Sequence, residues 1–184
     1  GLQHTESGSD VKFFAPGEED KPMELLGKSP KDIRDAGVHL SFVPEDRLGM
    51  GLVGTMGMTD NMMLKSYGEG RSPLVDHRAP RELAEKIRKE LGVVTPGLNT
   101  PVSRLSGGNV QKVLVGRELA ASPIVLMTAY AVRGLDINTS YTIYNLLTAE
   151  KLKGVAVIYV GEDLDVLLEL CDRILVLCGG KVSG

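Results

Sequence analysis

One segment of the sequence combines residue types that are suited to holding a phosphate group. It reads LSGGNVQK over residues 105–112 and opens a stretch with helical periodicity. A serine hydroxyl and two glycines at the start of a helix leave backbone N–H groups uncovered at the positive end of the helix dipole, where phosphate oxygens bind. An ordinary serine N-cap followed by flexible glycines is the simpler alternative. The segment therefore predicts either a phosphate-facing helix start or a plain helix cap.

A complete phosphate-binding loop needs the pattern GxxxxGK[ST] between a buried strand and a helix. The nearest candidate in the sequence is Gly27-Lys28-Ser29. Pro22 stands five residues before Gly27, and proline has no backbone N–H to donate. No buried apolar strand is indicated directly before this run, so we expect it to fail as a phosphate-binding loop.

The composition excludes several classes of protein. The 184 residues include 21 basic and 24 acidic side chains, and the net charge of −3 offers no basic surface for nucleic acid or anionic lipid. The longest apolar runs, such as residues 155–160, are far shorter than the roughly 18 residues that span a bilayer. Two cysteines and dispersed histidines give no disulfide framework and no metal site. Without an initiator Met or a signal peptide, the chain is expected to be a fragment of a cytoplasmic protein.

The elements that must position residues 105–112 alternate regularly along the second half of the chain. The expected helices have an apolar face, and they cover residues 106–121, 139–151 and 163–170. The expected strands are continuous apolar runs, at residues 124–128, 155–160 and 174–177. Apolar strands separated by amphipathic helices predict an α/β fold with a mostly parallel sheet covered on both faces. Gly179-Gly180 after the last strand favours a short antiparallel edge.

The first half of the chain gives fewer periodic signals. Leu83, Ala84, Ile87 and Leu91 have helical spacing and predict a helix over 80–91. Other expected elements are a short helix capped by Ser29, and strands at residues 11–14, 23–26 and 38–43.

Methionines are concentrated in one stretch of fourteen residues that also contains three glycines. They are Met50, Met56, Met58, Met62 and Met63. Because methionine is unbranched and adaptable, such a cluster suits a surface that accepts a helix of another protein. Filling gaps in the core is the alternative role for the same residues.

Four motifs resemble those of ATP-binding-cassette (ABC) ATPases, and they follow one another along the chain in the order found in that family. LSGGNVQK resembles the ABC signature motif, and SFVPEDR at 41–47 resembles the Q-loop of importers for simple sugars and nucleosides. RGLD at 133–136 resembles the D-loop, and GEDLD at 161–165 with CDRI at 171–174 resembles the switch-loop region. The resemblance covers about residues 29–184 and is greatest to a second, C-terminal nucleotide-binding domain.

This resemblance implies an ABC-type P-loop NTPase core whose N-terminal part, with the Walker A motif, is missing. Residues 1–184 would form a partial nucleotide-binding domain, with a helical subdomain at about 48–121. In the family, each signature motif closes over ATP held by the other domain. The residues implied to face the nucleotide are Ser106, Gly107, Gly108, Asn109, Gln111, Glu45 and Asp136.

Several positions depart from the family pattern. Ala129 stands where an aspartate orders Mg²⁺, and Tyr130 stands where a glutamate polarises water. Glu45 and Glu162 replace the usual Q-loop glutamine and switch-loop histidine. Alanine has no oxygen, and a neutral phenol is a poor base near pH 7. No catalytic residue is therefore expected to be intact, and the chain alone is expected to be inactive.

The resemblance also implies partners. ATP and Mg²⁺ would act in the full assembly, with neither tightly bound to this chain alone. The expected partners are transmembrane permease subunits, which would dock on the methionine-rich stretch, and a first nucleotide-binding domain. The location would be the inner face of the cell membrane, without insertion and without nucleic acid. A non-catalytic ABC-fold module that docks a permease is the alternative, and a DNA-repair type of ATPase is disfavoured because no coiled-coil insertion or basic groove is indicated.

Overall fold

The computed structural model describes residues 5–15, 17, 20–66 and 76–183. The chain divides into two compact units, residues 1–40 and 41–184. All residues expected to face nucleotide or a partner lie in the second unit. Among the described residues, no helix has both the length and the apolar character needed to span a bilayer.

The first unit contains a hairpin and a short helix. Strand β1 (Lys12–Phe13) pairs antiparallel with β2 (Met23–Glu24), so the two expected strands form but are shorter than predicted. Helix α1 (Pro30–Asp35) begins at the Ser29 cap, as predicted. Ser29 Oγ accepts from the Asp32 amide at 3.1 Å, and the Asp32 carboxylate accepts from the Ser29 amide at 3.2 Å. Since Asp32 occupies this helix start, Gly27-Lys28-Ser29 does not form a phosphate cradle.

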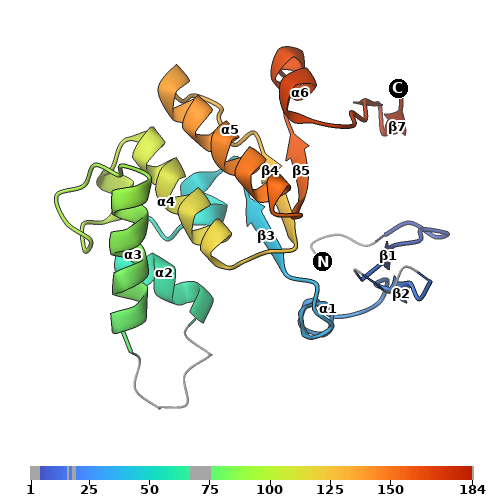
Figure 1. Cartoon of the computed structure of the whole chain (residues 1–184), viewed down its shortest axis with the longest axis horizontal. Helices are drawn as coiled ribbons and strands as arrows, with labels where there is room; N and C mark the ends of the chain where they lie inside the picture. Colours follow the sequence, from blue (N-terminus) through green and yellow to red (C-terminus); the bar gives the residue numbers. More distant parts are fainter. Residues whose placement is uncertain (1–4, 16, 18–19, 67–75, 184) are drawn as a thin grey trace. The chain divides into compact units, whose positions relative to one another are not determined.

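The second unit is built around a three-stranded sheet in the order β3-β4-β5 (Figure 1). Strands β4 and β5 run parallel, with Val125 opposite Ala156 and Ala129 opposite Val160. The strands and helices of this unit are β3 (Leu40–Val43), η1 (Arg47–Gly51, a π-helix), α2 (Met58–Ser66), α3 (Arg78–Glu90), η2 (Val102–Arg104, a 3₁₀ helix), α4 (Gly107–Ala120), β4 (Val125–Ala129), α5 (Ile137–Leu152), β5 (Ala156–Val160), α6 (Leu164–Leu170), β6 (Leu177–Cys178) and β7 (Lys181–Val182). The predicted α/β alternation from residue 106 to residue 170 is confirmed.

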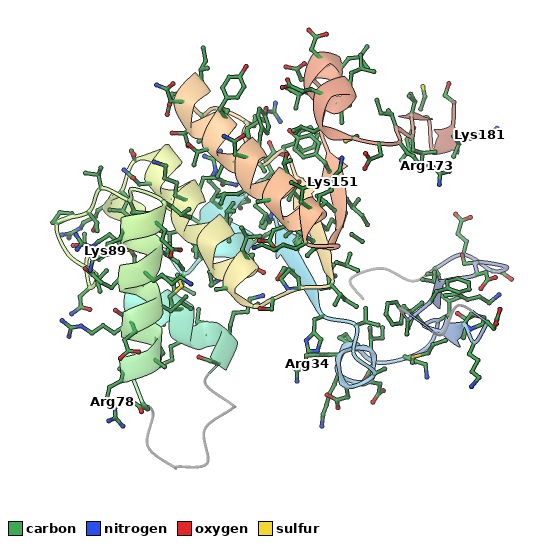
Figure 2. The ribbon with its side chains drawn as sticks, in the orientation of Figure 1. Arg34, Arg78, Lys89, Lys151, Arg173 and Lys181 are labelled. Carbon is green, nitrogen blue, oxygen red and sulfur yellow. The ribbon has the colours of Figure 1, made fainter. Side chains whose placement is uncertain are left out.

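Helix α4 is the central helix of this unit. It packs against α3 and α5, and eight of its residues are buried. A Cβ added at Gly116 would lie 2.7 Å from Ile87 Cγ2, so a larger residue here would force α3 and α4 to shift. Figure 2 shows Arg78 and Lys89 at opposite ends of α3, directed away from this contact. The position of α4 is therefore fixed by its core packing.

The buried residue Glu118 joins the last turn of α4 to strand β3 by hydrogen bonds. Glu118, which is 1% exposed, accepts from Arg117, from Lys65 Nζ at 2.8 Å and from the Phe42 amide at 3.3 Å. The Glu118 carbonyl oxygen accepts from Ser41 Oγ at 2.8 Å. These bonds hold β3, and hence the residues that follow it, against α4.

The expected strand at 174–177 is wrong. Only Leu177 and Cys178 have strand structure, and they pair with β7 in a separate antiparallel hairpin. The turn at Gly179-Gly180, with φ of 56° and 76°, confirms the predicted hairpin, but in the described chain β6 and β7 form a sheet of their own and not an edge of the β3-β4-β5 sheet. Leu175 and Val176 are 65% and 49% exposed, and the Val176 carbonyl oxygen accepts from the Ser183 amide at 2.8 Å.

Candidate functional site: the start of helix α4

The first turn of α4 has uncovered backbone amides, as the sequence predicts. The Ser106 hydroxyl does not cap the helix backbone, because it accepts from Asn109 Nδ2 at 2.9 Å. Asn109 Oδ1 in turn accepts from the Val94 amide at 2.9 Å. No described residue accepts a hydrogen bond from the amides of Gly107, Gly108 or Asn109. The main chain, and not the Asn109 side chain, is thus the part of this turn available to an anion.

Both glycines of this turn lie against other parts of the chain. A Cβ on Gly107 would lie 3.4 Å from Arg47 Nη1. A Cβ on Gly108 would lie 3.2 Å from Thr139 Oγ1 and 3.7 Å from Asp136 Oδ2. The glycines therefore allow α4 to approach Arg47 and the start of α5, in addition to leaving the amides accessible.

Arg47 is the first residue of η1 and reaches two separate segments. Its Nε donates to Gln111 Oε1 at 2.7 Å, and its Nη2 donates to the carbonyl oxygen of Arg133. Burial lowers the pKa of the Arg47 guanidinium from its ordinary value, but arginine remains protonated in proteins.

The expected contact between Gln111 and a nucleotide is corrected by its burial. Gln111 has no solvent exposure, and its Oε1 is engaged by Arg47. A side chain that is enclosed on all sides cannot touch a ligand at the helix start. Its role in the structure is to bind Arg47.

Asp136 caps helix α5. Its Oδ1 accepts from the Thr139 amide at 2.9 Å, and its Oδ2 accepts from Thr139 Oγ1 at 2.7 Å. These hydrogen bonds hold the pKa of Asp136 below its usual value, and the bond from the Thr139 amide has the larger effect. Both carboxylate oxygens are thus engaged within the chain.

An exposed ion pair links the residues after β3 to the residues after β4. Arg133 Nη1 lies 2.7 Å from Glu45 Oε1, with side-chain exposures of 59% and 48%. The Arg133 guanidinium also lies 5.8 Å from the centre of the Tyr130 ring, within the range of a cation–π contact. Because exposed ion pairs contribute little to stability, this pair mainly orients Glu45 and Arg133.

The carboxyl ends of β4 and β5 form the second predicted part of the site. Ala129 pairs with Val160, so Tyr130 and Glu162 follow neighbouring strand ends at the same edge of the sheet. Tyr130 has a φ of 51°, a left-handed conformation that is uncommon for a non-glycine residue. Glu162 is exposed, and no described residue pairs with its carboxylate.

This edge does not fit a Mg²⁺ ion held by the chain. Magnesium prefers carboxylate and water oxygens in octahedral geometry, and Ala129 offers no side-chain oxygen. Within the ranges that the structure describes, no group of three or more His, Cys, Asp or Glu residues is placed to hold a metal.

A cavity of about 780 Å³ lies beside β5. Its walls come from β5, the end of α5 and residues 170–177, and they include Tyr130 and Cys171. Lys151, labelled in Figure 2 near the end of α5, binds Asp172 Oδ1 at 2.8 Å and so ties α5 to this wall. Burial raises the pKa of the Cys171 thiol, so it is protonated near neutral pH.

The methionine-rich stretch divides between core and surface. Met58 and Met62 are 0% and 1% exposed, so the expectation that they contact a partner is wrong; they fill the core, which was the alternative. Met50 and Met56 are 63% and 36% exposed, and Met63 is half-buried. We define the Met50 surface as the exposed apolar residues of this region, which are Leu48, Met50, Val53, Met56 and Leu64.

The loop at residues 53–57, which carries Val53 and Met56 of the Met50 surface, is held from inside by Asn61. This side chain is fully buried. Its Oδ1 accepts from the Val53 amide at 2.8 Å, and its Nδ2 donates to the carbonyl oxygens of Val53, Met56 and Gly57 at 3.0–3.3 Å. A single buried amide thus fixes the backbone of residues 53–57.

Sequence relatives show to which proteins this chain is related. The xylose import ATP-binding protein XylG of Moorella thermoacetica is 34% identical over 189 residues, which cover 100% of this chain and 37% of that protein. The ribose import ATP-binding protein RbsA of Rhodopirellula baltica is 35% identical over 184 residues, which cover 100% of this chain and 34% of that protein. The chain thus spans about a third of the length of these curated relatives. No protein-family model matches it.

Solved structures show the fold. The ATP-binding cassette MJ0796, in a dimeric post-hydrolysis state bound to ADP and Pi, has a TM-score of 0.72 and 21% identity, over 88% of this chain and 68% of that one. A nucleotide-free cassette from an ABC transporter gives a TM-score of 0.66 and 22% identity, over 91% of this chain and 66% of that one. The chain is a homologue of ABC import ATP-binding proteins. Its fold class, an ABC-type α/β core, is confirmed.

The structure brings together the three segments that resemble the Q-loop, the signature motif and the D-loop. Arg47 bonds to Gln111 of α4 and to the carbonyl oxygen of Arg133, and Arg133 pairs with Glu45. Tyr130 is linked to this cluster through Arg133, whose guanidinium lies over the Tyr130 ring and whose amide donates to the Tyr130 carbonyl oxygen at 3.1 Å. For Glu162, the described residues provide no link to the cluster.

Sequence reasoning did not identify the side chains that hold these segments together. Arg47 and Thr139 were not expected at the site, although Arg47 ends the SFVPEDR run. The partners of Arg47 lie 64 and 86 residues away in the sequence, and no pattern in one sequence pairs residues at such separations.

Proposed function

We propose that this chain acts in an importer of simple sugars by completing, with its signature turn, an ATP site whose phosphate-binding loop belongs to a first nucleotide-binding domain. The observation that carries the proposal is the set of three uncovered amides at the start of α4, positioned by Arg47, Asn109 and Thr139. A helix start with free amides favours the phosphates of a nucleotide. In this assembly, residues 48–121 would be the helical subdomain of a partial nucleotide-binding domain.

The second part of the proposal is that the chain's own hydrolytic site is degenerate. The edge formed by Ala129, Tyr130 and Glu162 has no carboxylate at the end of β4, where Tyr130 offers only a neutral phenol, a poor base near neutral pH. Nucleotide held there would not be hydrolysed efficiently. Hydrolysis would instead occur at the site that the signature turn completes.

The names of the relatives guide the choice of solute. They are import proteins for xylose and ribose, so simple sugars are the proposed class, with nucleosides as the second class. The proposed assembly contains ATP and Mg²⁺, transmembrane permease subunits that dock on the Met50 surface, and the first nucleotide-binding domain. It would place this chain at the cytoplasmic face of the membrane.

Nucleotide titration tests the proposal. The full chain alone should bind ATP with a dissociation constant above roughly 10 μM, about −7 kcal/mol, and should show no Mg²⁺-dependent hydrolysis. Mixed with an intact first domain, it should increase that domain's ATP hydrolysis. Ser106→Arg should remove the increase, and Arg78→Met, on the exposed end of α3, should retain it. Tight ATP binding by the chain alone would contradict the proposal.

A second candidate function is a non-catalytic module that docks a permease. The exposure of Met50 and its neighbours favours it. In a reconstituted transporter, the module predicts that Met50→Glu prevents assembly while Ser106→Arg leaves transport-coupled ATP hydrolysis unchanged. The ATPase proposal predicts that Ser106→Arg abolishes hydrolysis in a complex that still assembles.

A further inference from the structure

The Arg47 side chain joins three segments that are distant in the sequence. Its Nε donates to Gln111 Oε1 at 2.7 Å, its Nη2 donates to the Arg133 carbonyl, and its Nη1 lies 3.4 Å from the position of a Cβ on Gly107. We infer that Arg47 is a positioning residue, which holds the first two turns of α4 in a fixed position relative to residues 130–136. The inference rests on the proposed function, because the position of this turn matters to ATP only if the turn faces it.

The backbone of Arg47 is itself fixed. Asp46 Oδ1 accepts from the Gly49 amide at 2.8 Å, which caps η1. The carbonyl oxygen of Arg47 accepts from the Leu52 amide at 2.7 Å. Short π-helical turns are rare and occur often at functional sites. Arg47 is the first residue of this turn, and its side chain bonds to α4 through Gln111.

Gln111 depends on Arg47 for its polar contact. Its side chain has no solvent exposure, and its Nε2 has no partner among the described residues. Turning the amide around would set its two N–H donors against the donors of the guanidinium. The observed orientation is therefore imposed by Arg47. Without the arginine, both polar atoms of a fully buried side chain would be unpaired, which is unfavourable.

The bonds of Arg47 are directional and are made to neutral oxygens. Glu45 is the carboxylate whose charge acts on Arg47, and Glu45 is paired with Arg133. The guanidinium thus works through its fixed fork of donors, which reach two acceptors in different directions. A lysine at this position would keep the charge but could not place donors at both acceptors in the same geometry.

Steady-state ATP hydrolysis by the reconstituted transporter, measured against ATP concentration, tests this role. Arg47→Met should raise the KM for ATP about tenfold, and Arg47→Lys should raise it less. The exposed control Arg78→Met should match the wild type. A role in folding alone would lower the maximal rate in proportion to the folded complex and leave the KM unchanged, and that result would overturn the inference.

A thermal unfolding cycle tests the Arg47–Gln111 bond without reference to ATP. Arg47→Met combined with Gln111→Leu should lower the melting temperature by less than the sum of the two single changes, because leucine leaves no unpaired polar atoms. Additive losses would overturn the inference even if Arg47→Met assembles poorly.

Ser106→Arg in the hydrolysis assay distinguishes a failure of the inference from a failure of the proposed function. If it abolishes hydrolysis while Arg47→Met leaves the KM unchanged, the proposed function stands and the inference fails; if it has no effect, both fail.

Discussion

The start of α4 and the carboxyl edge of β4 and β5 lie in the same unit but are held in different ways. At the start of α4, Arg47, Asn109 and Asp136 bond to groups from four segments of the chain. At the strand edge, Ala129 has no polar side-chain atom, and Glu162 is unpaired within the described residues. The start of α4 is thus held in place by polar side-chain bonds, whereas Ala129 and Glu162 at the strand edge contribute none.

The two regions meet the requirements of two different tasks in an ATP site to different degrees. Presenting backbone amides requires a defined position and no side-chain chemistry, and the polar bonds around α4 provide that position. Activating water requires a carboxylate or a base, and the strand edge supplies neither at Ala129 and Tyr130. The contrast matches a chain that completes another domain's site while its own site does not react.

The largest expected effect compares one variant in each region. Ser106→Arg should lower transport-coupled ATP hydrolysis about 100-fold, since it places bulk over the amides that we propose stabilise the reacting phosphates. Tyr130→Gln, at a site proposed to be inactive, should change the rate less than about twofold. The measurement is hydrolysis by reconstituted transporter at equal expression. Equal losses for the two variants would show that the strand edge takes part in catalysis.

A smaller effect is expected at Gly108, where the close packing of α4 against α5 can be tested. Gly108→Ala should lower the free energy of unfolding by about 1–2 kcal/mol, because the new Cβ would lie 3.2 Å from Thr139 Oγ1. In the background Thr139→Ala, which removes the two contacting atoms, the same change should cost clearly less. Chemical denaturation of the full chain measures both. A Gly108→Ala variant as stable as wild type would show that this contact is loose.

The smallest effect is the pH dependence of the Asp136 cap. Since bonds from Thr139 lower the pKa of Asp136, the ionised cap stabilises the folded chain above the ordinary pKa of 3.8. That stabilisation is lost as the pH falls below this value. The melting temperature of wild type should therefore exceed that of Asp136→Asn slightly at pH 6, and the gap should narrow as the pH falls below 3.8. A gap that does not depend on pH would show that the charge plays no part in the cap.

The sequence predicted the elements whose apolar residues follow one period. Helix α3 and the alternation from α4 to α6 have clear spacing, and they appear within a few residues of the expected positions. Helix α2 was missed because it buries Thr59 and Asn61 beside its methionines, so its inward face does not look apolar. The strand expected at 174–177 failed because an apolar run becomes a strand only where another strand pairs with it.

The candidate site was predictable as a segment but not as a set of contacts. The Ser-Gly-Gly run identified the helix start from local chemistry alone. The role of Gln111 could not be inferred, since one residue on α4 faces solvent or the interior depending on packing by distant segments. The same limit applies to Met58 and Met62, because a methionine side chain suits a docking surface and a core equally well.

Asn61 fixes the backbone of Val53 and Met56, two residues of the Met50 surface, and makes no bond to their side chains. The backbone course of residues 53–57 depends on an amide inside the protein, which no partner can reach. Exchanging Val53 or Met56 for another residue would thus change what this segment attracts while leaving its backbone course intact. Such a loop can acquire a new specificity by single substitutions, without a cost to the fold that carries it.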